Sequence, residues 1–161
     1  MIAAGQPNTD EVLNNTVTYY DTGNVFYESQ QYEAAINKYN KAIEQNPNYT
    51  KAYLGRGLAY LALDNCTDAI DDFSKAIELD LNLTEAYYKR GKAYYILKLY
   101  EKAIQDYNKA IELNPYLAEA YTGRGIAYYD SEHYEEAIAD FNNTLQLNSN
   151  DSLALYGKGL V

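Results

Sequence analysis

The chain has 161 residues, of which 47% are hydrophobic and 22% charged, with three Pro and nine Gly. This composition is typical of an ordered protein and excludes a disordered or collagen-like chain. The net charge of −10 argues against nucleic acid as the main partner, no apolar run approaches the roughly 18 residues that a membrane-spanning helix needs, and a single cysteine excludes an internal disulfide framework.

Residues 1–15 are predicted to be an N-terminal extension that is partly helical. Asn8 and Glu11 have the spacing of a capping box, and Thr16 and Tyr19 continue one helical face. We therefore expect the first helix to begin near Asp10 and to run long.

From residue 16 the sequence repeats itself with a period of 34 residues. Each line contains two helical patterns: Tyr87 and Gly91 share one face of a first helix, and Ala103 and Tyr107 share one face of a second. Such a helix pair must bury its apolar face against the next pair, so the period predicts a solenoid. The lines align without a gap at residues 16–49, 50–83, 84–117 and 118–151, and a partial fifth line covers 152–161.

The ends of the helices carry their own signals. Thr50 and Thr84 are placed to be N-caps of first helices. Pro47 and Pro115 are expected to end second helices, because proline biases the residue before it away from the helical region.

These residues resemble the tetratricopeptide repeat family. The resemblance spans about residues 16–161 and implies an all-α fold: a right-handed superhelical solenoid of antiparallel helix pairs, with four full repeats and the first helix of a fifth. The matching residues are Tyr53/Gly57/Tyr60, Tyr87/Gly91/Tyr94 and Tyr121/Gly125/Tyr128 in first helices, Ala69/Phe73/Ala76 and Ala103/Tyr107/Ala110 in second helices, and Pro47 and Pro115.

Glycine is used unusually in this pattern. Gly57, Gly91 and Gly125 each cost about 1 kcal/mol of helix propensity, so we expect them to let the paired helix approach closely. The family also has glycine in the turn between its two helices, whereas this chain has Gln30, Asp64, Lys98 and Glu132 there.

The sequence offers little that is typical of an enzyme, and we predict no catalytic residue, cofactor or metal. His133 lies in an acidic turn and is expected to be a solvated surface residue. Cys66 replaces a tyrosine of the other repeats and is expected to be a small buried filler. Acidic pairs such as Asp71-Asp72 and Glu135-Glu136 are expected to face solvent.

A second stripe on the first helices is the predicted binding surface. In the family that the chain resembles, this face lines the concave groove that holds partner peptides. Tyrosine suits such a groove because it combines apolar area with a hydroxyl. The alternative is that some of these rings only pack against neighbouring repeats. The predicted residues are Tyr20, Asn24, Tyr27, Leu54, Leu58, Leu61, Tyr88, Lys89, Lys92, Tyr95, Thr122, Ile126, Tyr129 and Tyr156.

Charge distinguishes one repeat. Among the four full repeats, only residues 84–117 carry more Lys and Arg than Asp and Glu, so Lys89 and Lys92 are candidates to bind a carboxylate of a partner; the alternative is ordinary pairing with Glu85 and other helix neighbours. The chaperone-tail clamp of some family members is not expected, because only Asn24 agrees among the matching positions Tyr20, Asn24, Gly55, Glu85 and Lys89.

Six glycosylation sequons begin at Asn14, Asn48, Asn65, Asn82, Asn142 and Asn150. We predict a cytoplasmic protein, because four of the six sequons recur two residues before a Thr or Ser that we expect to cap the next helix. The alternative is an extracytoplasmic, glycosylated protein.

The leading prediction is therefore a non-enzymatic protein–protein interaction scaffold that binds a peptide segment in a Tyr-rich groove, with no nucleic acid and no membrane insertion. One alternative is self-assembly into a homo-oligomer through the terminal helices. Another is a regulatory segment of a larger multidomain enzyme.

Overall fold

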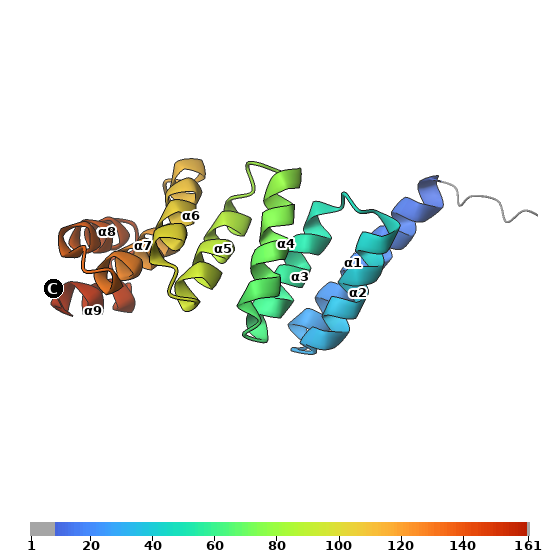
Figure 1. Cartoon of the computed structure of the whole chain (residues 1–161), viewed down its shortest axis with the longest axis horizontal. Helices are drawn as coiled ribbons and strands as arrows, with labels where there is room; N and C mark the ends of the chain where they lie inside the picture. The colour runs from blue at the N-terminus through green and yellow to red at the C-terminus, as the bar shows by residue number, and fades with distance from the viewer. Residues whose placement is uncertain (1–8, 161) are drawn as a thin grey trace, which may run out of the picture. The chain divides into compact units, whose positions relative to one another are not determined.

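The structure is a computed structural model that describes residues 9–160. Those residues form nine helices and no strand, so the predicted all-α fold is confirmed (Figure 1). The chain splits into two compact units, of which Met1–Asp80 contains α1 to α4 and Leu81–Val161 contains α5 to α9. The helices are α1 (Thr9–Glu28), α2 (Tyr32–Gln45), α3 (Thr50–Ala62), α4 (Cys66–Leu79), α5 (Thr84–Ile96), α6 (Tyr100–Leu113), α7 (Ala118–Asp130), α8 (Tyr134–Leu147) and α9 (Ser152–Leu160).

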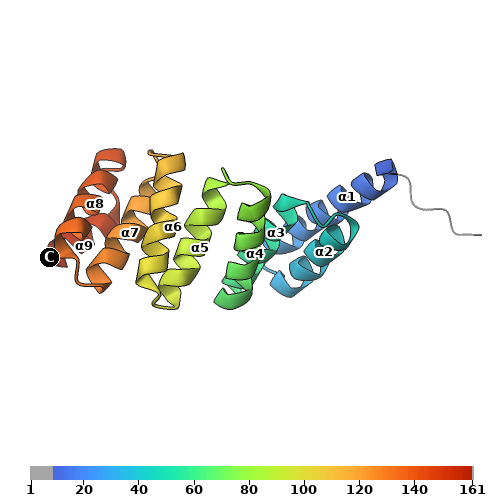
Figure 2. The same ribbon diagram turned by 45° about the horizontal axis from the view of Figure 1, so that its top comes forward.

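Helices that follow one another pack side by side within each unit. In Met1–Asp80, α2 contacts α1 and α3, and α3 contacts α4 (Figure 2). In Leu81–Val161 the same order runs from α5 to α9, and the first helices α5, α7 and α9 also contact one another in turn. Each unit is therefore a stack of helix pairs, as expected for a repeat in which neighbours bury each other's apolar faces.

One aromatic ring fills the seam of each pair, and glycines make room for it. A Cβ added to Gly91 would lie 3.0 Å from Cε1 of Tyr107, and one added to Gly123 of the next first helix would lie 2.8 Å from Cζ of the same ring. Phe141 is enclosed in the same way by Gly125 and Gly157. The prediction that these glycines allow close approach is confirmed. It was incomplete, because glycines of the following helix hold the far side of the ring.

The turn inside each pair has a left-handed residue where the family has glycine. Gln30, Asp64, Lys98 and Glu132 have φ of 59°, 58°, 59° and 66°. The residue that follows donates its backbone N–H to a carbonyl five residues earlier, as Leu99 does to Tyr94 at 2.9 Å. This pattern closes the first helix with a Schellman motif, so the non-glycine residues adopt a conformation that their side chains disfavour.

The predicted helix ends are confirmed in part. Helices α2 and α6 end before Pro47 and Pro115, and their C-caps Asn46 and Asn114 are extended as expected. The N-cap prediction was wrong. Thr50 and Thr84 are the first residues of α3 and α5, and the preceding N-caps have no side-chain hydrogen bond. Backbone geometry between the repeats therefore starts these helices without a hydroxyl cap.

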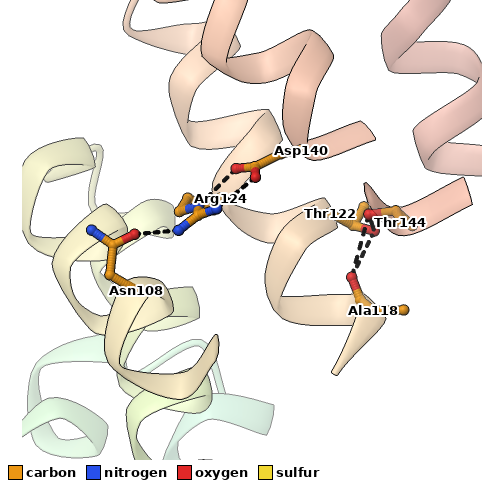
Figure 3. A network of polar contacts seen from close by, with 6 residues as sticks. All are labelled: Asn108, Ala118, Thr122, Arg124, Asp140 and Thr144. Carbon is orange, nitrogen blue, oxygen red and sulfur yellow. Dashed lines mark hydrogen bonds and ion pairs between the residues drawn. The ribbon is translucent and has the colours of Figure 1, made fainter. Parts of the chain in front are cut away.

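A buried ion pair links the two helices of a repeat. Arg124 of α7 donates from Nε and Nη2 to both carboxylate oxygens of Asp140 on α8, at 2.7 and 2.6 Å, and its Nη1 donates to Asn108 of α6 (Figure 3). Arg56 bonds Asp72 and Asn40 in the same way. The expectation that Asp72 faces solvent was wrong: the residue is 4% exposed, because the guanidinium compensates its buried charge.

Helix α1 begins at Thr9, one residue before the predicted start. The predicted capping box of Asn8 and Glu11 lies outside the residues whose side chains the structure describes. Farther along, Thr16 is fully buried and its hydroxyl donates to the carbonyl of Val12 at 2.8 Å.

Candidate functional site

In the first unit, the predicted stripe is half-buried and takes part in packing. The ring of Tyr20 meets Tyr49 edge-on, with 5.5 Å between centroids, and also contacts Tyr39. Tyr27 meets Tyr32 in the same way at 5.4 Å. Leu54, Leu58 and Leu61 of α3 are half-buried as well.

Asn24 is also engaged inside the fold. Its side-chain oxygen accepts a hydrogen bond of 2.9 Å from the hydroxyl of Tyr39, whose ring is almost fully buried. In this unit the stripe residues therefore pack within the fold, which agrees with the alternative that some of the rings only pack against neighbouring repeats.

In the second unit, the stripe lines a cavity of about 250 Å³. Its wall combines residues of the first helices α5 and α7 with the ring of Tyr107 from α6 and with the turn that leads into α9. Predicted residues in the lining are Tyr88, Lys92, Tyr95, Thr122 and Ile126, and the others are Tyr107, Glu119, Gly123, Asp151 and Leu153.

A second cavity, of about 230 Å³, adjoins the first, because Ile126 and Leu153 line both. The ring of Phe141 belongs to its wall. It contains the predicted residues Tyr129 and Tyr156, and its remaining lining is Asp130, Gly157 and Leu160. We call the two cavities together the C-terminal groove.

Two predicted residues contribute less than expected. Thr122 is 5% exposed; its hydroxyl donates to the carbonyl of Ala118 at 3.2 Å and lies 3.1 Å from that of Thr144 (Figure 3). Lys89 lines neither cavity, and its ammonium lies 5.5 Å from the centroid of the Tyr88 ring. Of the two predicted lysines, only Lys92 lines the groove.

The groove contains carboxylates that the sequence reasoning missed. Glu119 and Asp130 lie on α7 at the two ends of the stripe that Thr122 and Ile126 define, so extending the same helical spacing by one turn each way would have found them. Leu153 of α9 has the same repeat position as Glu119, so the same extension from Tyr156 would have found it, whereas Asp151 comes from the turn before α9 and no helical spacing marks it.

Burial and acidic neighbours hold the tyrosine hydroxyls of the groove protonated. Burial, and after it the Glu119 carboxylate, raises the pKa of Tyr88. Burial also raises the pKa of Tyr95, whose hydroxyl donates a 2.6 Å hydrogen bond to Oδ2 of Asp130 across α5 and α7. Burial is the main cause that raises the pKa of Tyr107. These rings therefore present neutral hydroxyls at physiological pH.

The remaining candidates for chemistry lie outside the groove. Cys66 is 3% exposed and free, and burial raises the pKa of its thiol, with the Asp64 carboxylate adding to the effect. His133 is an exposed residue at the start of α8, so its prediction as a surface residue is confirmed. Within residues 9–160, no cluster of His, Cys, Asp or Glu has the arrangement of a metal site, and no helix is long and apolar enough to cross a membrane.

The Thr residues of three sequons do not cap the helices that they were expected to cap. Asn14 lies inside α1 rather than before a helix, and the hydroxyl of Thr16 bonds within that helix. Thr50 and Thr84, which belong to the sequons of Asn48 and Asn82, are the first residues of α3 and α5 and are not N-caps. Helix capping by Thr or Ser thus does not account for the recurrence of these motifs.

Comparisons with protein families agree on one repeat. The family model described as tetratricopeptide repeat matches residues 84–117 and 118–151, and a second model with the same description matches residues 50–83. A model described as TPR repeat matches residues 23–64. A search of curated proteins finds no significant match.

Several solved structures are similar over most of the chain. The MamA protein is 29% identical with a TM-score of 0.86, and the match covers 91% of this chain and 80% of that one. The first TPR of Spaghetti (RPAP3) bound to the HSP90 peptide SRMEEVD is 27% identical with a TM-score of 0.73, covering 74% and 94%. The Arabidopsis OM64 TPR domain is 28% identical with a TM-score of 0.72, covering 74% and 98%.

Proposed function

Since the chain belongs to the tetratricopeptide repeat family, we propose that it is a non-enzymatic scaffold that holds a peptide segment of a partner protein in the C-terminal groove. One observation carries the proposal: Tyr88, Lys92, Tyr95 and Ile126, which sequence periodicity places on one stripe, line a single cavity. A relative of the same fold, the first TPR of RPAP3, has been solved with a bound peptide, which supports this use of the groove.

The composition of the groove suits recognition of a side chain. The rings of Tyr88 and Tyr107, with Ile126 and Leu153, offer apolar surface to a buried anchor, and anchors of this kind supply most of the affinity of a peptide complex. Leu153 is 57% exposed and Tyr156 67%, so burying them against a partner would stabilise a complex.

Several polar groups of the groove already serve the fold, which favours a scaffold over an enzyme. Asp130 accepts the hydroxyl of Tyr95, Asp151 accepts the backbone N–H of Ala154 at 2.8 Å as an N-cap of α9, and Thr122 bonds Ala118. These bonds fix the shape of the groove in advance, which lowers the entropic cost of binding.

The test is a selection of random displayed 12-residue peptides on the immobilised chain, followed by affinity measurements on the enriched peptides by fluorescence anisotropy. Leu153→Asn should weaken binding about tenfold or more, because it replaces an apolar side chain in the lining of both cavities with an amide that an apolar anchor leaves without a hydrogen bond.

Leu155→Asn is the matched control. Leu155 lies on the same helix, is 54% exposed and lines neither cavity, so its substitution should leave the affinity unchanged. Peptides that bind both variants as tightly as the parent chain would place recognition elsewhere and contradict the proposal.

A further inference from the structure

Negatively charged side chains outnumber positively charged ones in the lining of the C-terminal groove, and this excess indicates the charge of the partner. The two cavities contain one ammonium, that of Lys92, and three carboxylates, those of Glu119, Asp130 and Asp151. We infer that the partner segment is cationic and consists of apolar anchor residues with Lys or Arg beside them. This inference rests on the proposed function.

The carboxylates are placed to receive a partner's cation. Glu119 is exposed, and the described residues provide it with no hydrogen bond or ion pair. Asp130 accepts Tyr95 through Oδ2, and Asp151 accepts Ala154 through Oδ1, so each has a second oxygen that these two bonds do not use. A guanidinium or ammonium entering the groove would meet acceptors on both sides of the apolar lining, and such charge-assisted bonds are the stronger kind.

The other cations of the same repeat line neither cavity, although Lys98 lines a separate cavity beside Tyr95 and Asp130. Arg90 is bound to Asp106 through Nε and Nη2 at 2.7 Å each, and Lys109 is paired with Glu112. Lys89 lies beside the Tyr88 ring and lines neither cavity. The groove thus has the sign of the whole chain, whose net charge is −10. An acidic ligand such as SRMEEVD would bring carboxylates toward carboxylates.

The peptides enriched by the parent chain provide the test. Lys and Arg should be enriched within one or two positions of an apolar residue, and affinity should fall as salt rises, because exposed charge pairs are screened. Three synthetic versions of one enriched peptide, with Lys, Gln or Glu flanking the anchor, should bind in that order. The SRMEEVD peptide should bind more weakly than the Lys version.

Substitutions in the groove assign the effect to its carboxylates. The double variant Glu119→Gln with Asp151→Asn keeps the size of both side chains, and Asn retains the N-cap of α9. It should weaken the Lys peptide roughly three- to tenfold and leave the Gln peptide unchanged. Glu135→Gln, on an exposed residue of α8 outside both cavities, is the control and should change neither.

The outcomes separate this inference from the proposed function. Equal or tighter binding of the Glu version by the parent chain, or a double variant that binds the Lys peptide as tightly as the parent chain does, overturns a cationic partner held by these carboxylates and leaves a peptide groove in place. Failure of the parent chain to enrich any peptide contradicts both. Loss of Lys preference in the double variant, with the Gln peptide still bound, supports both.

Discussion

At four places in the described chain, an aromatic ring of a second helix lies against a glycine of the first helix in the same repeat. The rings are Tyr39, Phe73, Tyr107 and Phe141, and they face Gly23, Gly57, Gly91 and Gly125. All four rings are almost fully buried, so they have no room to move away from an added carbon atom. The close packing of each helix pair therefore depends on the absence of a Cβ atom at these glycines.

Gly125→Ala should destabilise the chain by about 1 to 3 kcal/mol, because the new Cβ would lie 2.9 Å from Cε1 of the buried Phe141 ring. Gly159→Ala is the matched control: it occupies the same repeat position in α9, where nothing lies within 4 Å. There the gain in helix propensity should make the change neutral or slightly stabilising. Urea denaturation measures both, and an equal loss at both positions would refute the close-approach argument.

Cys66 should resist alkylation in the folded chain. Its thiol is 3% exposed, and burial raises its pKa, so the reactive thiolate is scarce at pH 7.5. Mass spectrometry after treatment with iodoacetamide should find little modification without denaturant and complete modification in 6 M guanidinium, and a thiol that reacts equally fast in both would disagree with a buried filler. Raising the pH should speed the native reaction, because the thiolate population grows as the pH approaches the raised pKa.

At the scale of helices, the sequence predicted which elements exist but missed the polar bonds between them. Arg56, Arg90 and Arg124 recur every 34 residues, and each is bound to the Asp that lies 16 residues later. The recurrence was visible in the sequence. Its meaning was not, because helical periodicity assigns charged residues to solvent unless a buried partner of opposite charge is identified.

Asp140→Ala should cost roughly 3 to 5 kcal/mol of folding free energy, because it leaves Arg124 largely buried without its bidentate partner. Glu112→Ala removes a carboxylate from the exposed Lys109 pair and should cost less than about 1 kcal/mol. Thermal and urea denaturation of the two variants compares them directly. Similar small losses would mean that the buried pair contributes no more than a surface one.

Lys98→Gly should stabilise the chain by about 1 kcal/mol, because φ at this turn is 59° and glycine adopts it without the strain of a side chain. The same substitution at Gln105, an exposed position inside α6, should cost about 1 kcal/mol through lost helix propensity. Opposite shifts of the urea midpoint confirm the argument, whereas destabilisation at both positions contradicts it.

At the scale of the whole molecule, the repeat period was enough to predict the helix pairs, and seven of the fourteen residues predicted for the stripe line the two cavities. The charge of the groove follows from helical spacing only in part. Glu119 and Asp130 lie one turn beyond the predicted stripe, whereas Asp151 comes from a turn and Lys89 lies beside the Tyr88 ring outside both cavities.

The most direct test of the peptide groove follows isoleucine methyl groups by NMR while an enriched peptide is added. The methyl signal of Ile126, which lines both cavities, should shift and saturate with the affinity found by anisotropy, while Ile138 of α8 outside the groove stays unchanged. A peptide that shifts the methyl signal of Ile138 and leaves that of Ile126 unchanged would contradict a peptide-binding site in the C-terminal groove.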